Sequence, residues 1–351
     1  MPELTDGQND QLLNAISNCT IFDVAIIGGG VAGLSAGIYA SRDNLNTLVL
    51  EGTIESSVDA PGGALLLTSN IENYPGYEGA AGEELISTMR AQAETFGAII
   101  KGERVSDLDA KLKTGEKHVI TTTEGNTYLA RSIIIATGAI ARRLGIAGEE
   151  ELYGRGVSTC ATCDGFMFKE KTVAVVGGGD TAVEDALLLT GYAKKVYLIV
   201  RGNDLRSSGP EAREIINHPD VTILWNTTVE SVTPTANGFS VDHIVTQNRT
   251  TKELTNIDVD GLFVAIGSDP ATGFLNHSAV LLDSDGYIKT IPGTTRVEGG
   301  IPGIFAAGDV ADKVFRQAIT SAGTAVQAAL EVRAYLAAPQ IPEPKRVTSR
   351  I

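Results

Sequence analysis

Two cysteines separated by two residues are the clearest chemical feature of this sequence. They lie in the hexapeptide Cys-Ala-Thr-Cys-Asp-Gly at residues 160–165. Two thiols at this spacing can close into a small disulfide ring or open to a dithiol, so the pair can store two electrons. The acid after the second cysteine can supply or take up the proton that accompanies each transfer. The hexapeptide therefore predicts a redox centre formed by Cys160, Cys163 and Asp164.

A pair of cysteines at this spacing is also half of a zinc site, which is the alternative interpretation. Such a site needs four ligands. The remaining candidate ligands are Cys19, His118, His218, His243 and His277, none of them at metal-ligand spacing. We therefore favour redox chemistry and expect no metal.

A glycine-rich loop upstream has the context of a dinucleotide site. The run Gly-Gly-Gly-Val-Ala-Gly at 28–33 follows an expected strand at 21–27 and precedes an expected helix at 34–41. A second strand, expected at 47–50, ends at Glu51, 23 positions after Gly28. Strand, glycine loop, helix, strand and acid in this order predict that the backbone contacts a pyrophosphate and that Glu51 binds a ribose.

The same pattern restarts after the cysteine pair. The run Gly-Gly-Gly-Asp-Thr-Ala at 177–182 lies between an expected strand at 171–176 and an expected helix at 182–189. The next expected strand, 195–200, ends at Arg201, where the first copy has an acid. A cation there suits a 2′-phosphate, and Arg206 adds a second one, which favours NADPH. The alternative is that Arg201 is an ordinary surface arginine.

Composition limits the function classes. The 351 residues allow two or three domains, and the formal net charge of −15 argues against nucleic acid or an anionic membrane as partner. No apolar run approaches the roughly 18 residues that span a bilayer. The N-terminus lacks the features of a secretory signal, and three cysteines, two of them paired by spacing, suit a reducing compartment. We therefore expect a cytoplasmic protein.

Further elements are expected around these motifs. Proline-glycine turns bracket a loop at 64–73 that can lie along a flat cofactor; the alternative is an ordinary surface loop. Asp309 stands at the tip of an expected strand at 303–309. The other expected segments are a helix at 83–95, a hairpin at 119–123 and 127–130, strands at 132–136 and 259–267, a long helix at 318–336, a short amphipathic segment at 8–18 and a mobile tail at 337–351.

These segments define an α/β protein with two Rossmann-like nucleotide-binding domains, the second inserted into the first. The first domain is expected to be discontinuous, residues 1–139 and 268–351. The inserted domain is expected to span 140–267 and to carry the cysteine pair. Each join follows a strand that ends in glycine, so we expect two short hinges.

Together these motifs resemble the low-molecular-weight thioredoxin reductase family over about residues 20 to 336. The matching motifs are GGGVAG at 28–33, APGG at 60–63, ENYPG at 72–76, ATGA at 136–139, CATCDG at 160–165, VVGGGDTAVEDA at 175–186, FAAGD at 305–309 and RQA at 316–318. The resemblance implies the FAD/NAD(P)-binding fold and a disulfide in the pyridine-nucleotide domain.

The resemblance also implies the ligand-binding residues. FAD would be bound on the split domain by Gly28, Gly30, Gly33, Glu51, Gly62, Gly63, Asn73, Thr137, Gly138, Gly308, Asp309, Arg316, Gln317 and Ala318. NADPH would be bound on the inserted domain by Gly177, Gly179, Asp180, Thr181, Arg201 and Arg206.

The family further implies the route of the electrons. A hydride would pass from NADPH to the flavin, and electrons would pass on to the disulfide and then to thioredoxin or a thioredoxin-like protein. Cys163 would face the flavin and begin attack on thioredoxin, with Cys160 as its partner and Asp164 as proton donor and acceptor. The inserted domain would rotate on its hinges between the half-reactions, and a homodimer is expected.

Several alternatives stay open at this point. The family's phosphate motif, His-Arg-Arg-x-x-x-Arg, is matched here only at Arg201 and Arg206. NADH and ferredoxin are therefore alternative electron donors. A dithiol oxidase, passing electrons from a small dithiol through flavin to oxygen, is a different enzyme of the same chemistry. A flavin- or nucleotide-sensing module without catalysis is a further alternative, although it would not need the redox hexapeptide.

Overall fold

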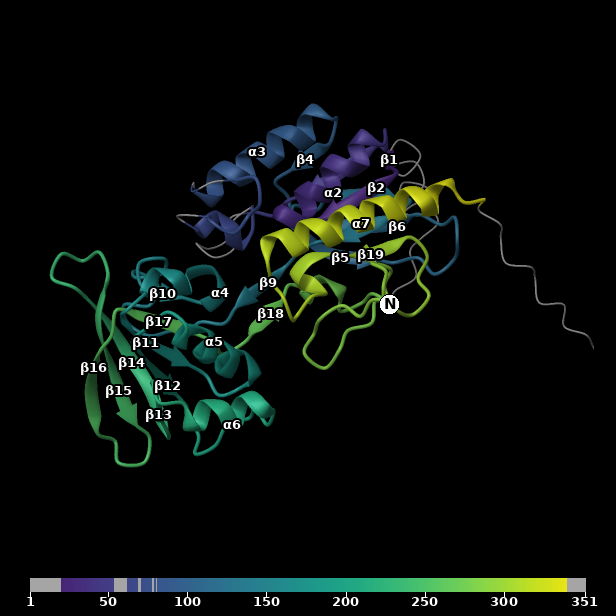
Figure 1. The fold of residues 1–351 in the computed structure, drawn as a ribbon. Coiled ribbons are helices and arrows are strands. Elements are labelled where there is room, and N and C mark those ends of the chain that lie inside the picture. The colour runs from purple at the N-terminus through teal and green to yellow at the C-terminus, as the bar shows by residue number, and fades with distance from the viewer. Residues whose placement is uncertain (1–19, 54–61, 69–70, 78, 80, 340–351) are drawn as a thin grey trace, which may run out of the picture. The chain divides into compact units, whose positions relative to one another are not determined.

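The computed structural model describes residues 20–53, 62–68, 71–77, 79 and 81–339 (Figure 1). The chain divides into two compact units. Unit 1 comprises Met1–Ile140 with Pro270–Ile351, and unit 2 comprises Ala141–Asp269. The expected segment at 8–18, Cys19 and most of the expected tail lie outside the described residues.

Unit 1 is built around a five-stranded parallel sheet of order β19-β8-β2-β3-β4, and a second sheet has the order β1-β7-β6-β5. Its strands are β1 Ile21–Phe22, β2 Val24–Ile27, β3 Thr47–Leu50, β4 Ile99–Lys101, β5 Val105–Asp109, β6 His118–Thr122, β7 Thr127–Ala130, β8 Ile133–Ile135 and β19 Ile304–Ala306. Its helices are α2 Val31–Arg42, α3 Gly82–Thr95 and α7 Ala318–Ala337, with short 3-10 turns η1 Ala64–Leu67, η3 Gly273–Leu275 and η4 Gly308–Val310.

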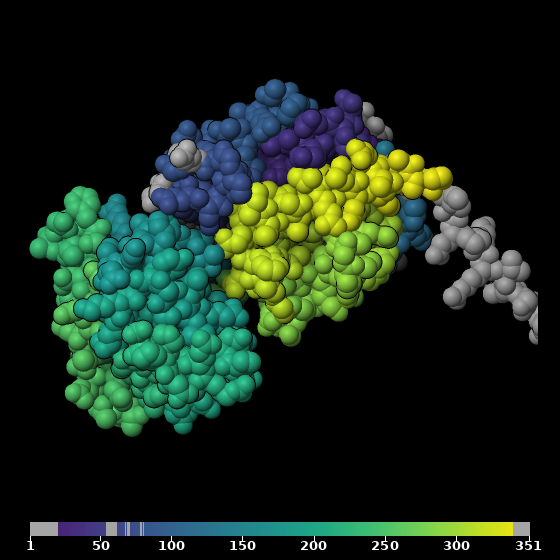
Figure 2. Space-filling model, viewed as in Figure 1, coloured from purple at the N-terminus to yellow at the C-terminus, as the bar shows by residue number. Residues whose placement is uncertain are grey.

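The two faces of the parallel sheet bury different partners. Alternate residues of one strand point to opposite faces, so Ile26 packs toward α2, α3 and α7, whereas Ile27 packs toward the second sheet. The helix face is lined by alanines such as Ala36 and Ala328, which let the helices lie close to the strands and to one another. Unit 1 is therefore a three-layer structure of helices, parallel sheet and second sheet (Figure 1). The space-filling view shows the C-terminal segment, in yellow, at the surface of this unit (Figure 2).

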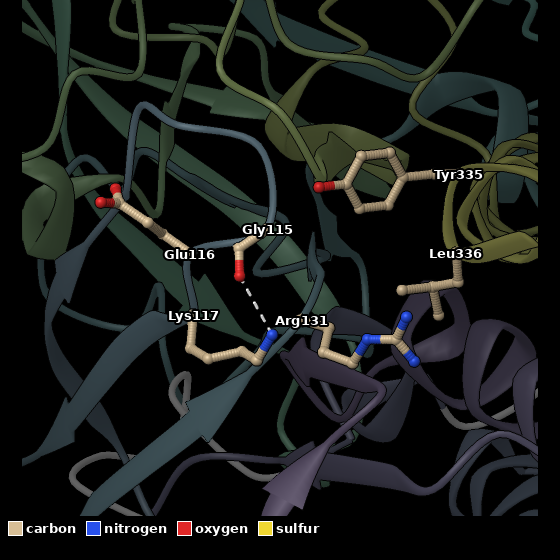
Figure 3. A pocket seen from close by; sticks show the side chains of 6 residues that line it. All are labelled: Gly115, Glu116, Lys117, Arg131, Tyr335 and Leu336. Carbon is tan, nitrogen blue, oxygen red and sulfur yellow. Dashed lines mark hydrogen bonds between the residues drawn. The ribbon is translucent and has the colours of Figure 1, made fainter. Parts of the chain in front are cut away.

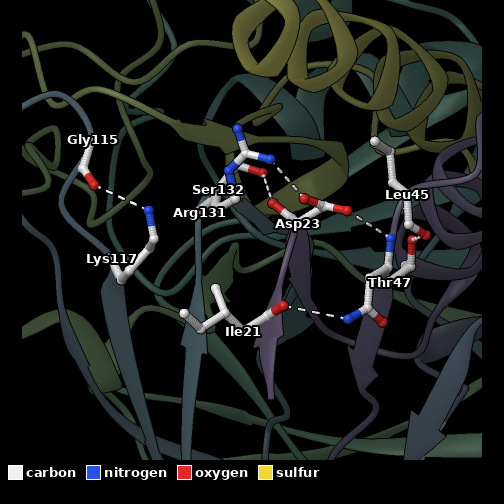
Figure 4. Close-up of polar contacts among 9 residues, drawn as sticks. Ile21, Asp23, Leu45, Thr47, Gly115, Lys117, Arg131 and Ser132 are labelled. Carbon is white, nitrogen blue, oxygen red and sulfur yellow. Dashed lines mark hydrogen bonds and ion pairs between the residues drawn. The ribbon is translucent and has the colours of Figure 1, made fainter. Parts of the chain in front are cut away.

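Polar contacts close the sheet edge at which the strands of unit 1 begin (Figure 4). Asp23 precedes β2, and its carboxylate accepts hydrogen bonds from the Arg131 guanidinium at 2.8 Å and from the Asn46 backbone N–H at 3.0 Å. The Ser132 hydroxyl donates to the Asp23 carbonyl at 2.7 Å. Because these residues precede β8, β2 and β3, the contacts tie three strand beginnings together.

A small pocket lies beside the same residues, with a volume of about 40 Å³ (Figure 3). It is lined by Gly115, Glu116, Lys117, Arg131, Tyr335 and Leu336. Pockets that bind small molecules usually have volumes of about 300–1,000 Å³. The pocket is therefore too small for a nucleotide.

Unit 2 repeats the three-layer plan. Its parallel sheet has the order β10-β17-β11-β12-β13, and an antiparallel sheet has the order β14-β15-β16. Val173 and Val175 face α5 and α6, whereas Ala174 and Val176 face the antiparallel sheet. Its elements are β10 Val157–Ser158, α4 Ala161–Asp164, η2 Gly165–Phe168, β11 Thr172–Val176, α5 Asp180–Thr190, β12 Lys195–Ile199, α6 Pro210–Asn217, β13 Val221–Leu224, β14 Thr227–Pro234, β15 Val241–Asn248, β16 Leu254–Asp258 and β17 Gly261–Val264.

The chain passes between the units twice, through two short strands that pair in a two-stranded sheet, β9 Ala139–Ala141 and β18 Ser268–Pro270. On the unit 1 side, the backbone N–H of Ala271 donates to the Gly138 carbonyl at 3.0 Å. On the unit 2 side, the backbone N–H of Arg142 donates to the Gly267 carbonyl at 2.9 Å. Each unit is thus closed on itself where the chain enters and leaves.

The predicted α/β class is confirmed, and most predicted elements of both glycine-loop units are present. Three predictions were wrong in detail. The strand expected at 259–267 is shorter and comprises only β17, Gly261–Val264. The strand expected at 21–27 is interrupted at Asp23, and β1 pairs with β7 of the second sheet rather than with the parallel sheet. The strand expected at 303–309 ends at Ala306, because Gly308, at a φ of +74°, turns the chain into η4, which contains Asp309.

Candidate active site and nucleotide sites

Four strands of unit 1 end at one edge of the sheet. β19, β8, β2 and β3 are parallel neighbours, so their carboxyl ends meet there. The residues that follow these strands are predicted site residues, namely Gly28, Glu51, Thr137, Gly138, Gly308 and Asp309. In parallel sheets this edge is where nucleotides bind.

The glycine loop of unit 1 is closely packed by the backbone around it. Gly28 has a φ of +118°, and a Cβ there would lie 2.2 Å from the Ala136 carbonyl oxygen. A Cβ at Gly33 would lie 1.8 Å from the Gly28 carbonyl oxygen. The next helix, α2, has Gly30 as its N-cap without a side-chain cap, so its first backbone N–H groups stay available for an anion. These features fit a bound pyrophosphate.

Asp309 has the chemistry of a buried acceptor. Its Oδ1 accepts a hydrogen bond from the Ser321 hydroxyl at 2.8 Å. Burial raises the pKa of Asp309 to about 6, and Asp312 adds to this, whereas the Ser321 hydrogen bond and the Arg316 cation oppose it. A carboxylate with so few donors around it can accept further hydrogen bonds. The hydroxyl groups of a ribityl chain would provide them.

Glu51 has a partner that the sequence did not indicate. The Arg90 guanidinium on α3 donates to Oε2 of Glu51. A Cβ at Gly29 would lie 2.2 Å from Cβ of Glu51, so the glycine loop packs directly against the end of β3. Glu51 therefore stands where a ribose is expected, with Arg90 holding one of its two oxygens.

The remaining predicted FAD residues form two smaller groups. Gly62 lies against the glycine loop, since a Cβ at Gly30 would be 3.6 Å from the Gly62 carbonyl oxygen. The Asn73 amide donates to Oε1 of Gln317 at 3.3 Å, and Gln317 caps α7. The rest of the predicted set comprises Gly63, the next residue of that loop; Ala318, the first residue of α7; Arg316, with a φ of +47°; and Thr137, whose hydroxyl donates to the Ala271 carbonyl at 2.8 Å.

The glycine loop of unit 2 has the same geometry. Gly177 has a φ of +153°, and a Cβ there would lie 2.3 Å from the Ala265 carbonyl oxygen. Gly179 is the N-cap of α5, without a side-chain cap, and Asp180 and Thr181 form its first turn. This loop also leaves helix N–H groups for an anion.

Two predicted cations lie at this loop. Arg201 is exposed and follows β12 at the end of the βαβ unit. Arg206 is also exposed, and its backbone N–H donates to the Gly178 carbonyl at 2.7 Å. The Arg206 guanidinium lies 3.5 Å from where a Cβ of Gly179 would be. Both arginines are thus positioned to contact phosphate.

Cys160 and Cys163 form a disulfide in unit 2, with 5.3 Å between their Cα atoms. Cys160 is the N-cap of α4, and its Sγ accepts a hydrogen bond from the Cys163 backbone N–H at 3.1 Å. Both cysteines are half-buried, and Thr162 between them is exposed. The donor at the helix N-terminus would stabilise negative charge on the Cys160 sulfur once the disulfide is open.

Asp164 is held by a serine that the motif did not include. The Ser158 hydroxyl donates to Oδ2 of Asp164 at 2.6 Å and accepts from the Cys160 backbone N–H at 3.0 Å. Burial raises the pKa of Asp164, and the Ser158 hydrogen bond opposes the rise. A carboxyl group with a raised pKa four residues after a helix-capping cysteine is suited to exchanging protons with sulfur.

This combination of two nucleotide folds and a redox disulfide defines a class. The family model described as pyridine nucleotide-disulphide oxidoreductase matches residues 22–329. The thioredoxin reductase of Schizosaccharomyces pombe is 45% identical over 316 residues, 89% of this chain and 96% of that protein. The thioredoxin reductase of Rickettsia bellii is 44% identical over 314 residues, 89% of this chain and 97% of that protein.

Solved structures agree with these relatives. Thioredoxin reductase from Giardia duodenalis has a TM-score of 0.84 at 37% identity and covers 91% of this chain and 99% of its own. The enzyme from Streptococcus pyogenes has a TM-score of 0.82 at 36% identity and covers 90% and 98%. The chain therefore belongs to the pyridine nucleotide-disulphide oxidoreductases and, within them, to the thioredoxin reductases, a family that depends on FAD and NADPH.

Two further observations concern the residues that the structure describes. No cluster of three or more His, Cys, Asp and Glu side chains suited to a metal ion occurs among them. None of the helices in this part of the chain combines the length and the hydrophobicity that a bilayer crossing requires.

Proposed function

We propose that this chain reduces the disulfide of a thioredoxin with electrons from NADPH, with FAD bound to unit 1 and NADPH bound to unit 2. One observation carries the proposal. The Cys160–Cys163 disulfide, with Asp164 beside it, lies in the same unit as a nucleotide loop whose second strand ends in a cation. The thioredoxin reductases named above support thioredoxin as the substrate.

FAD, when bound, supplies the two-electron relay between the pyridine nucleotide and the disulfide. In unit 1, the helix N-terminus behind Gly30 would hold its pyrophosphate, and Glu51 would hold its ribose. Asp309 would accept hydrogen bonds from ribityl hydroxyls, which would offset the unfavourable burial of its charge.

The cysteines carry the chemistry with the protein substrate. Reduction adds two electrons and two protons to the Cys160–Cys163 bond and leaves two thiols. The Cys163 thiolate then attacks one sulfur of thioredoxin's disulfide, and the other thioredoxin sulfur leaves and takes a proton. The Cys160 thiolate attacks the sulfur of Cys163, which restores the Cys160–Cys163 disulfide and releases reduced thioredoxin. The assignment of attack to Cys163 rests on the family resemblance.

Asp164 manages the protons of this cycle. Its raised pKa lets it hold a proton closer to neutral pH than an ordinary aspartate does. It can therefore protonate a cysteine sulfur when the disulfide opens and take the proton back when the thiolate forms. Ser158 fixes the orientation of the carboxyl group for this exchange.

A pair of single substitutions tests the proposal. Cys163→Ser should abolish thioredoxin-dependent oxidation of NADPH, because the Cys160–Cys163 disulfide cannot form and the sulfur that attacks thioredoxin is missing. The absorbance of the bound flavin should still respond to NADPH. Cys160→Ser is the matched variant; it should also lose turnover but should trap thioredoxin as a mixed disulfide through Cys163. Turnover by Cys163→Ser, or a protein purified without flavin, would refute the proposal.

The electron donor is tested separately. Anaerobic titration of the flavin absorbance with NADPH, NADH and reduced ferredoxin should give complete reduction at the lowest concentration of NADPH. Ferredoxin remains the second candidate because the phosphate motif is incomplete, although an acidic partner would have to approach a chain of net charge −15.

Rotation between the half-reactions, the homodimer and a cytoplasmic location stay predictions. Full turnover after crosslinking of the two units would exclude the rotation.

A further inference from the structure

A third arginine lies at the cation end of the nucleotide loop in unit 2, contributed by a distant part of the chain. Arg249 follows β15 in the turn that leads to β16. Its Nη1 donates to the backbone carbonyl of Arg201 at 2.8 Å, although the two residues are 48 positions apart. The guanidinium of Arg249 therefore lies at the carboxyl end of β12, where the ribose of a bound dinucleotide is recognised.

The turn that carries Arg249 is anchored to the same place by its backbone. The Arg249 N–H donates to the Asn226 carbonyl at 2.7 Å, and the Asn226 N–H donates to the Gly202 carbonyl at 2.7 Å. Asn248 stabilises the turn itself, since its Oδ1 accepts from the backbone N–H groups of Thr250 at 2.9 Å and Thr251 at 3.0 Å. Arg249 is thus held in place by hydrogen bonds of its backbone as well as by the hydrogen bond of its side chain.

Three arginines of unit 2, Arg201, Arg206 and Arg249, lie without an ion pair among the described residues, although the protein has a net charge of −15. All three side chains are exposed. The contact with the Arg201 carbonyl uses one of the five donors of the Arg249 guanidinium, which leaves four for another acceptor. Such a group is suited to a phosphate dianion.

We propose that Arg249 binds the 2′-phosphate of NADPH together with Arg201, so that two separate segments of unit 2 set the preference for NADPH over NADH. The inference rests on the proposed function, in which NADPH binds to this loop. It assigns to the β15–β16 turn a cation that the local phosphate motif lacks, since Gly202 follows Arg201 here.

The test measures binding of a fragment that carries the 2′-phosphate. Isothermal titration calorimetry on the flavin-loaded full chain would compare adenosine 2′,5′-bisphosphate with adenosine 5′-monophosphate. Arg249→Gln should raise the Kd for the bisphosphate about ten- to a hundredfold, the worth of one charge-assisted hydrogen bond. The Kd for the monophosphate and the kcat/KM for NADH should not change. Arg249→Lys should fall between wild type and Arg249→Gln, because it keeps the charge without the planar donors.

Lys252→Gln is the matched control. It removes one positive charge from the same turn, at a residue that already has a φ of +63° and is exposed. An equal loss of bisphosphate affinity in Lys252→Gln would overturn the proposal. The loss would then come from the overall positive charge of the turn and not from a direct contact of Arg249 with the phosphate. Unchanged affinity in Arg249→Gln would overturn it too, while leaving the use of NADPH intact. A wild-type protein that binds the two nucleotides equally would instead overturn the assignment of NADPH itself.

Discussion

The two glycine loops have similar backbone conformations and packing. They differ in the residues at the end of the second strand. In both, the first glycine has a positive φ, and a Cβ there would strike a carbonyl oxygen of a neighbouring segment. After β3 the chain places Glu51, whose partner is Arg90. After β12 it places Arg201, with Arg249 against its carbonyl. We therefore infer that the backbone of the glycine loop would place the pyrophosphate and that the charge at the strand end would select the ribose.

The two units also share an aspartate–serine hydrogen bond. Each holds one aspartate with a raised pKa against a single serine hydroxyl, Asp309 with Ser321 in unit 1 and Asp164 with Ser158 in unit 2. In unit 1 the pair lies at the ligand edge of the sheet, whereas in unit 2 it lies at the disulfide. Under the proposed function, similar electrostatics would serve ligand binding in unit 1 and proton transfer in unit 2.

The largest effect is expected from exchanging the last small residue of each loop. Gly33 of unit 1 corresponds to Ala182 of unit 2. Gly33→Ala would place a Cβ 1.8 Å from the Gly28 carbonyl oxygen, so the helix must move. We expect a loss of about 3 kcal/mol or more in the free energy of unfolding, and purified protein without flavin. Urea unfolding and the flavin-to-protein absorbance ratio measure both.

Ala182→Gly is the reciprocal change and should be mild. It removes one methyl group from the first turn of α5 and should cost about 1 kcal/mol, the difference in helix propensity between alanine and glycine. If Gly33→Ala kept its flavin and its stability, the close packing of the unit 1 loop would not be what holds the cofactor.

The next effect concerns Asp309 and pH. Its pKa is about 6 in the folded protein against an ordinary 3.8, so the folded state holds the proton more tightly than the unfolded state. The stabilisation is therefore complete below pH 3.8 and is lost as pH rises to about 6. The loss amounts to about 3 kcal/mol at most in flavin-free protein. Asp309→Asn should remove it, as unfolding free energies measured between pH 4 and pH 8 would reveal.

His118 makes the free energy of unfolding change with pH in the opposite direction over the same range. Asp309→Asn must therefore be compared with wild type at each pH. Burial lowers the pKa of His118 to about 4 from 6.5, so stability is lost as pH falls through this interval. The contribution of His118 cancels in the difference between the two curves. A difference that does not change with pH would show that Asp309 does not titrate in this range.

A charge reversal at the strand end tests the comparison most directly. Arg201→Glu gives the second loop the acid of the first. We expect kcat/KM for NADPH to fall about a hundredfold, because a favourable charged contact becomes a repulsive one, with little change for NADH. Steady-state kinetics with both nucleotides measure the ratio. An unchanged ratio would place the selection of the donor elsewhere.

The smallest effect is expected at the aspartate–serine pair of unit 2. Ser158→Ala removes the only side-chain hydrogen bond found to lower the pKa of Asp164, so that pKa should rise further. A hydrogen bond worth about 1 kcal/mol corresponds to a shift of about 0.7 pH unit in the profile of kcat. Ser158→Thr keeps the hydroxyl and should leave the profile in place. A shift in the acid direction would contradict the role given to Ser158.

Both strand–glycine loop–helix units could be predicted from the sequence because each is encoded by residues that lie close together in the chain. A strand, a glycine loop and a helix follow one another within about 20 residues, and β3 was predicted with its observed bounds. The break at Asp23 was missed because the apolar run around it reads as one strand. The Asp23 carboxylate accepts a hydrogen bond from Arg131, 108 residues away, and no local sequence pattern reveals such a partner.

The same reason explains which site residues were missed. Arg90 and Ser321 hold Glu51 and Asp309 at separations of 39 and 12 residues, and Arg249 reaches Arg201 across 48. None belongs to a motif, and an arginine or a serine carries no sign of its tertiary partner. Ser158 lies only two residues before Cys160, yet its role depends on the turn of α4 that brings Asp164 back to it.

The paired strands β9 and β18 bring together the two places where the chain enters and leaves unit 2. In unit 1 the flanking residues Gly138 and Ala271 are already joined by a hydrogen bond of 3.0 Å. A short linker would therefore suffice to reconnect unit 1 after excision of residues 141–269. Both halves have their own hydrophobic cores, so such an excision, or a graft of another reductase's insert, need not reroute any other part of the polypeptide.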